Sequence, residues 1–321
     1  MSATEDFSSI NRSKADFSAI YVQPDPRAYF RTLGALGYVI PHLARPVFDQ
    51  LIEARQRAKG GGPITVLDLG CSYGVNAALM KYAINYDHLA ERYDTLTYQP
   101  SAPEEVLRLD RHYFASWPKK RDIRVIGLDI SREAVRYAED CGILDVGIVA
   151  DLENEDISPL AAQELSKVDL IVSTGCVGYV SNRTFERLAA CTAHGEAPWV
   201  ASFVLRMFDY GDIAQTLKRQ GLVTQKFEGA TFVQRRFRDE EEMRGTLDAL
   251  SGRNLSPAGK EAEGLFHAEL FFSRPKAESE AMPINRLISV ASGANRNYGR
   301  RPRVPTRPVK TVRQARPAIP A

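Results

Sequence analysis

Short apolar runs alternate along this chain with segments whose apolar residues recur at helical spacing. A short continuous apolar run is typical of a strand that is buried on both faces of a parallel sheet. The helical segments between such runs supply the crossovers that parallel strands need. The five strands predicted in this way are Ile64–Leu69, Ile123–Asp129, Val146–Ala150, Val168–Ser173 and Trp199–Met207.

The segments that join and follow these strands complete the predicted fold. Helices are expected at Val75–Leu89, from Ser131 as the N-cap to Asp140, and at Asp156–Lys167, Asn182–Cys191 and Ile213–Gln220. After these, two strand-like segments, Thr231–Phe237 and Leu265–Phe272, flank a charged helix, Asp239–Leu250. The sequence therefore predicts an α/β protein with a doubly wound, mostly parallel seven-stranded sheet and an antiparallel edge hairpin.

Domain boundaries follow from the same pattern. Residues 1–14 are polar, and we predict that they are disordered. Residues 15–62 read as an N-terminal helical segment, with one helix at Arg27–Leu36 and another after Pro41. Residues 63–275 form the main domain, with an insertion at 90–122, and residues 276–321 read as a basic, Pro/Arg-rich disordered tail.

The first strand and the turn after it, Ile64–Gly74, form the central motif of the chain. Asp68 stands near the end of the apolar run, and Gly70 and Gly74 allow a tight turn with an open backbone. A carboxylate at the end of a buried strand is costly unless it has a partner. The dinucleotide pattern Gly-x-Gly-x-x-Gly needs glycine at 72 and 75, where the chain has Ser72 and Val75.

An acidic residue followed by Gly-x-Ser-x-Gly resembles the first motif of the class I S-adenosylmethionine (SAM)-dependent methyltransferases, with Ser72 in place of the middle glycine. The resemblance extends in pattern over Ile64–Ser273 and implies a Rossmann-like methyltransferase fold that binds SAM. In that family an N-terminal helical segment often covers the cofactor pocket. Tyr29, Tyr38 and His42 are therefore candidate lid residues.

Further acids follow the next two strands. In an open parallel sheet, ligands bind outside the carboxyl ends of the strands. Asp129 can accept two hydrogen bonds from a vicinal diol, and Asp151 can accept one from an exocyclic amine. The resemblance implies that Asp129 binds the ribose of SAM, that Asp151 and Leu152 bind the adenine, and that Asp68 and Gly70 lie along the methionine part. The full set of predicted cofactor-binding residues is Asp68, Gly70, Cys71, Gly74, Asp129, Ile130, Asp151, Leu152 and Thr174.

Methyl transfer requires the acceptor to be held in line with the methyl group, and a proton acceptor matters only if the acceptor must lose a proton. The predicted catalytic residues are Tyr179, Asp209 and His112, with Cys176 and Tyr210 as further candidates. Gly175 and Gly178 would let the backbone near Tyr179 approach a ligand. For Tyr179 a place in the core is an equally good interpretation. The insertion carries His112, and we expect it to contact the substrate, the alternative being a peripheral helix.

Charge and composition disfavour some classes of function. From Asn285 to the end the chain has nine basic residues and no acid, so without them the net charge falls from +2 to −7 over residues 1–284. The body therefore offers no general basic surface for nucleic acid, although the tail could tether RNA. Four scattered cysteines, no metal-ligand spacing and no apolar run of membrane-spanning length favour a cytoplasmic protein without a resident metal.

Three functional hypotheses follow. The first is a SAM-dependent methyltransferase that acts on a small-molecule acceptor by in-line transfer. The second is a cyclase or lyase of the same fold that consumes SAM and releases methylthioadenosine. The third is an RNA-directed methyltransferase, or a non-catalytic binder, that relies on the basic tail. Asn-Pro-Pro-Tyr, typical of many amide- and base-methylating relatives, does not follow the fourth strand, which favours the small-molecule hypothesis.

Overall fold

A computed structural model describes residues 7, 11, 14–94, 101–192 and 196–290 of the chain. Within this part, eight strands form one sheet in the order β3-β2-β1-β4-β5-β8-β6, and β7 also pairs with β8. The strands are β1 (Ile64–Leu69), β2 (Ile123–Asp129), β3 (Val146–Val149), β4 (Leu170–Thr174), β5 (Trp199–Leu205), β6 (Leu222–Lys226), β7 (Phe232–Arg236) and β8 (Leu265–Pro275).

The first five strands are parallel to one another, and β8 runs antiparallel to β5, β6 and β7. The predicted doubly wound, mostly parallel sheet is therefore confirmed. The strand count and the position of the reversed strand differ from the prediction, because β8 lies between β5 and the edge strands β6 and β7. The missed strand, Leu222–Lys226, buries only Leu222 fully, so its apolar signal is weak.

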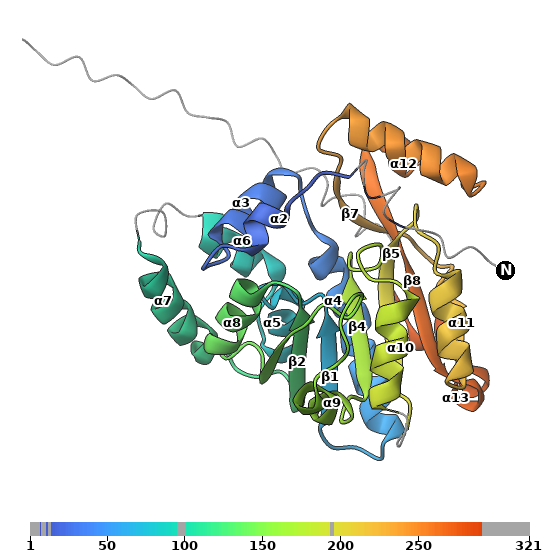
Figure 1. The fold of residues 1–321 in the computed structure, drawn as a ribbon, viewed down its shortest axis with the longest axis horizontal. Helices are drawn as coiled ribbons and strands as arrows, with labels where there is room; N and C mark the ends of the chain where they lie inside the picture. Colours follow the sequence, from blue (N-terminus) through green and yellow to red (C-terminus); the bar gives the residue numbers. More distant parts are fainter. Residues whose placement is uncertain (1–6, 8–10, 12–13, 95–100, 193–195, 291–321) are drawn as a thin grey trace, which may run out of the picture.

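Helices cover both faces of the sheet (Figure 1). They are α2 (Ser18–Tyr21), α3 (Arg27–Ala35), α4 (Ile40–Ala58), α5 (Val75–Lys81), α6 (Tyr86–Asp94), α7 (Pro103–Ser116), α8 (Arg132–Asp140), α9 (Pro159–Leu165), α10 (Asn182–Cys191), α11 (Gly211–Arg219), α12 (Glu240–Gly252), α13 (Lys276–Ala281) and α14 (Ile284–Leu287), with a short 3-10 helix, η2, at Glu261–Glu263. Helices α3 and α12 lie at the end toward which the parallel strands point (Figure 1).

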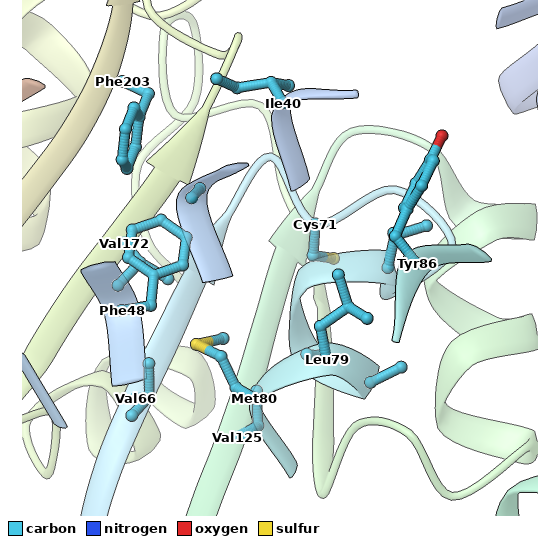
Figure 2. Close-up of a cluster of buried hydrophobic side chains, with 14 of the residues drawn as sticks. Ile40, Phe48, Val66, Cys71, Leu79, Met80, Tyr86, Val125, Val172 and Phe203 are labelled. Carbon is cyan, nitrogen blue, oxygen red and sulfur yellow. The ribbon is translucent and has the colours of Figure 1, made fainter. Parts of the chain in front are cut away.

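Two apolar clusters lie on opposite faces of the sheet. Alternation along the strands divides them, since Val66 of β1 joins the first cluster and its neighbour Leu67 joins the second. Helices α3 to α6 and α8 pack on the first cluster, and α9 to α11 pack on the second. Figure 2 shows part of the first cluster, where Phe48 of α4 lies near Val172 of β4.

The single helix predicted at Val75–Leu89 is wrong, because α5 ends at Lys81 and α6 begins at Tyr86. Tyr82 adopts an extended backbone and forms an isolated bridge with Lys119, and the Ala83 amide donates to the Pro118 carbonyl at 2.9 Å. The helix thus gives way to a short pairing with the end of the insertion.

Both predicted disordered ends contain placed residues. Residues 276–287, assigned from sequence to the tail, form α13 and α14, and Ile284 and Ile288 are buried in the first cluster. At the other end, Phe7 packs edge-to-face on Phe208. The rest of the predicted tail, residues 291–321, and most of residues 1–13 lie outside the described residues.

Candidate functional site

The candidate site lies at the carboxyl ends of β1, β2 and β4, which are neighbours in the middle of the sheet. In the strand register, Asp68 of β1 lies opposite Gly127 of β2 and Val172 of β4. Asp129 ends β2 and Thr174 ends β4. Three residues predicted from sequence to bind one ligand therefore share one edge of the sheet.

Asp68 is a fully buried carboxylate whose hydrogen bonding is incomplete. Its Oδ1 accepts a hydrogen bond of 3.3 Å from the Asn76 side chain on α5, and the Ala77 amide also donates to the carboxylate. Its Oδ2 is buried and has no protein partner among the described residues. Burial, with a smaller contribution from the charge of Asp129, raises the pKa of Asp68 to about 7. A cationic donor from a ligand would satisfy both the free oxygen and the charge.

The turn after β1 uses the left-handed backbone that its glycines permit. Gly70 has a φ of 73° and Gly74 a φ of 75°, and Ser72 between them also has a positive φ, 49°. A Cβ atom at Gly70 would lie 2.7 Å from Cys176 Sγ, and one at Gly74 would lie 2.7 Å from Ile143 Cγ2. Both glycines thus make room for protein neighbours, and Cys176 is the side chain that covers the turn.

Asp129 binds the backbone of this turn. Its Oδ2 accepts from the Ser72 amide and its Oδ1 from the Ser131 amide, each at 2.9 Å. Burial raises the pKa of Asp129, and these backbone hydrogen bonds oppose that shift. Each carboxylate oxygen retains capacity for a further hydrogen bond, as a ribose diol would need. The next residue, Ile130, exposes 67% of its surface and is an apolar side chain beside the acid.

Asp151, unlike Asp129, uses its carboxylate oxygens within its own loop. Its Oδ1 accepts from the Glu153 amide at 3.1 Å and its Oδ2 from the Asn154 side chain at 2.8 Å, so both oxygens hold their own loop. Leu152 is buried in the second apolar cluster. The loop still lies next to Asp129, because the Ala150 amide donates to the Asp129 carbonyl at 3.2 Å.

Thr174 and Cys71, the remaining predicted cofactor residues, have contrasting positions. Thr174 Oγ1 accepts from the Asn76 side chain at 2.9 Å, so one amide side chain contacts both Asp68 and Thr174. Cys71 points into the core near Leu79 (Figure 2), and a Cβ at Gly127 would lie 2.8 Å from its Sγ. Only the backbone of Cys71 can therefore face a ligand at the rim.

The predicted catalytic residues are not brought together. Tyr179 lies on the loop after β4, with 59% of its surface exposed and the Lys14 ammonium over its ring. Asp209 accepts from the Gly211 amide at 3.1 Å and pairs with Arg253 at 3.4 Å, so it holds the start of α11. Tyr210, a weaker candidate, is buried against Phe271, which fits a core role.

His112 lies on the exposed side of α7, where its Nδ1 is 2.8 Å from the Arg108 carbonyl oxygen. The same helix is fixed from its other side, since buried Asp110 accepts from Tyr93 of α6 and Tyr137 of α8. Helix α7 of the insertion therefore packs on α6 and α8, and His112 lies away from this packing.

The N-terminal segment packs against two turns of the candidate site. Tyr73 in the turn after β1 donates to the carbonyls of Ile20 and Gln23, and Ser131 donates to the Tyr21 carbonyl. Of the predicted lid residues, Tyr38 has a phenol whose pKa burial raises to about 12, while its neighbours Tyr29 and Thr174 oppose the shift. Tyr29 packs among aromatic rings, and His42 is half-buried on α4.

Some residues at the site escaped the sequence analysis. Asn76 stands two positions after Gly74, and an amide at the start of a helix next to an acidic strand end is a signal that could have identified it. Lys14 and the buried pair of Arg235 and Glu242 could not have been found in this way. They lie far from the motif in sequence, and only the fold brings Lys14 to Tyr179.

Other kinds of site are not supported within the described ranges. No group of three or more potential metal-ligating side chains occurs there. None of the helices placed in those ranges is both long and apolar enough to cross a membrane.

The sheet, with one reversed strand near an edge and a polar rim at the ends of the parallel strands, has a Rossmann-like, doubly wound arrangement. No family model and no curated protein matches the chain.

Solved structures do match the chain. A TehB-like SAM-dependent methyltransferase from Corynebacterium glutamicum is 19% identical, with 68% of this chain and 86% of that one covered and a TM-score of 0.33. The plantazolicin methyltransferase BpumL, bound to a pentazolic desmethylPZN analogue and S-adenosylhomocysteine (SAH), is 12% identical. The match covers 85% of this chain and 100% of that one, with a TM-score of 0.43. Magnesium protoporphyrin IX methyltransferase (ChlM) from Synechocystis PCC 6803, with bound SAM, is 12% identical over 85% and 99%, with a TM-score of 0.37. These similarities concern the fold, and the function must be argued from the site.

Proposed function

We propose that this protein is a SAM-dependent methyltransferase that transfers a methyl group in line to a small-molecule acceptor. The observation that carries the proposal is a pair of carboxylates at the ends of neighbouring strands, Asp68 fully buried and Asp129 half-buried, with the pKa of both raised by burial. Buried acids without cationic partners destabilise a fold, so their presence at a ligand-binding edge indicates a function.

The residues at the rim fit SAM. Asp129 would hold the ribose hydroxyls, and the free Oδ2 of Asp68 would accept from the amino group of the methionine part. Ile130 and the loop at Asp151 and Leu152 would lie along the adenine. Gly70 and Thr174 border the methionine side, with the backbone of Cys71 and Gly74 completing the turn.

A bound SAM supplies an activated methyl group on a sulfonium, so the chain has mainly to position the acceptor and exclude water. Tyr38, a neighbour of Thr174, would help to close the site from the N-terminal side. Tyr179 follows β4, exposes 59% of its surface and presents its ring to the Lys14 amine. We assign Tyr179 to acceptor positioning, and Asp209 to the start of α11.

Calorimetric titration with SAM and with S-adenosylhomocysteine (SAH) tests the cofactor. Asp129→Ala should abolish measurable binding, because two charge-assisted hydrogen bonds of roughly 1.5–3 kcal/mol each would be lost. Asp248→Ala, which removes an exposed acid on α12, is the matched control and should bind like the wild type. Absence of heat from the wild type at millimolar ligand would refute the proposal.

Product analysis tests the reaction. Formation of SAH that depends on an added acceptor supports methyl transfer, whereas methylthioadenosine released without an acceptor indicates a SAM-consuming cyclase or lyase. Deleting residues 294–321 should leave small-molecule turnover nearly unchanged, and a loss of function would instead indicate that the basic tail recruits RNA.

A further inference from the structure

Lys14 is the residue at the rim that the proposed function leaves unexplained. Its Nζ lies 3.9 Å from the centroid of the Tyr179 ring and 5.2 Å from that of Phe208. Phe7 packs edge-to-face on Phe208 with the ring centroids 5.2 Å apart. Tyr179 and Phe208 thus form two walls of an aromatic cage around an aliphatic ammonium, an arrangement that selects cationic amines.

The chain builds this cage with specific contacts. Before Lys14 in the sequence, the Asn11 side chain donates to the Gly178 carbonyl. After it, the Ala15 amide donates to Glu242 Oε1 at 2.9 Å. Gly178 has a φ of 109°, and a Cβ there would lie 2.5 Å from the Phe208 ring, so only glycine allows this loop to pack on that ring. The segment around Lys14 is therefore tied to the loop after β4.

The charges that face Lys14 leave its amine available. Glu242 is paired with Arg235 through two hydrogen bonds of 2.6 and 2.8 Å, and it also accepts from two backbone amides. In the part of the chain that the structure describes, Lys14 itself has no ion pair. Burial, followed by repulsion from Arg235, lowers the pKa of Lys14 to about 7, while Glu242 and Cys176 oppose the shift. A large fraction of this side chain is thus an uncharged nucleophile at neutral pH.

Cys176 connects this cage with the proposed cofactor site. It covers Gly70, and the charges of Asp129, Asp68 and Lys14 all act on its thiol. Lys14 therefore lies beside the loop that follows β4 and within electrostatic range of the thiol that covers the turn after β1. An amine in this position has the chemistry of a methyl acceptor.

We propose that Lys14 occupies the acceptor subsite and is methylated by the chain's own SAM, which makes the aromatic cage a subsite for aliphatic amines. This inference rests on the proposed methyltransferase function. In the step, the lone pair of Lys14 Nζ attacks the methyl carbon, and an N–C bond forms while the C–S bond breaks. The electron pair of that bond stays on sulfur, giving SAH, and the methylated ammonium releases a proton to water.

The test incubates the full chain with SAM that carries a trideuteromethyl group and maps the label by peptide mass spectrometry. The expected result is one labelled methyl group at Lys14, formed at a rate per chain that does not depend on protein concentration. Lys14→Arg should lose at least nine-tenths of the total label. Lys276→Arg, which alters an exposed lysine on α13, should keep it.

Calorimetry provides a readout that does not depend on turnover. At pH 6 most of Lys14 is protonated, and its ammonium repels the SAM sulfonium but not the neutral sulfur of SAH. At that pH, Lys14→Met should bind SAM up to roughly tenfold more tightly and SAH unchanged. Two results would overturn the inference alone: a protein that binds SAM but carries no label at Lys14, or a Lys14→Met variant whose affinity for SAM relative to SAH is unchanged. A wild-type chain that binds neither ligand would overturn the proposed function and this inference together.

Discussion

The replacement Asp68→Asn tests two effects of the buried carboxylate separately: the stability that it costs the ligand-free fold, and the affinity for SAM that its charge provides. The asparagine retains the shape of the side chain and can still accept from Asn76, but it cannot ionise. We expect the ligand-free variant to be more stable than the wild type above neutral pH and to bind SAM more weakly. Few changes at a buried polar position are expected to stabilise a fold, so the direction is diagnostic.

The magnitude follows from the pKa of Asp68, which burial raises from 3.8 to about 7. A carboxyl group whose pKa is higher in the folded state binds its proton more tightly there. The contribution of Asp68 to wild-type stability is therefore most favourable below pH 4, falls as the pH rises, and levels off above pH 7. A shift of about three units corresponds to roughly 4 kcal/mol at most. The affinity for SAM should fall about tenfold to a hundredfold, since a hydrogen bond to a charged group contributes roughly 1.5–3 kcal/mol.

Urea unfolding of both proteins from pH 4 to pH 8 measures the first effect, and calorimetry with SAM measures the second. The comparison of the two proteins cancels the titration of other groups. Equal stability at pH 8 would show that the Asp68 carboxylate is not destabilising in the empty site. Undiminished SAM affinity would show that its charge does not bind the ligand.

Two other predictions concern packing around the site. Gly70→Ala should destabilise the fold by about 1–3 kcal/mol more than Gly60→Ala in urea unfolding, because both have left-handed backbones but only the first places a Cβ against Cys176. Equal costs would refute the proposed overlap. Arg235→Met should cost about 3–5 kcal/mol by leaving the buried carboxylate of Glu242 without its partner. The double variant with Glu242→Met should recover much of that loss, and a fully additive effect would contradict the pairing.

Much of the fold could be predicted from local pattern. The boundaries of Ile123–Asp129 and Asn182–Cys191 were predicted exactly as they are observed, and Ser131 caps α8 as expected, since its side chain accepts from the Ala134 amide. Strong apolar runs and capping residues act within a few positions of the chain. The break after Lys81 could not be predicted, because its cause is the pairing of Tyr82 with Lys119.

In the candidate site, too, some residues could be placed from the sequence and others depend on long-range contacts. Asp68, Asp129 and Thr174 end strands of one parallel sheet, so their proximity follows from topology alone. His112 lies on the exposed side of α7, and its contact with a substrate stays a prediction. Lys14 was missed because a short polar segment has no periodicity, and its position depends on contacts with residues more than 160 positions away.

The central claim is that the ends of β1 and β2 hold SAM, and a crystal structure of the protein with SAH tests it most directly. We predict the ribose against Asp129 and the amino group within hydrogen-bond distance of Asp68 Oδ2. A nucleoside bound elsewhere, or an empty rim in crystals grown at saturating ligand, would contradict the account.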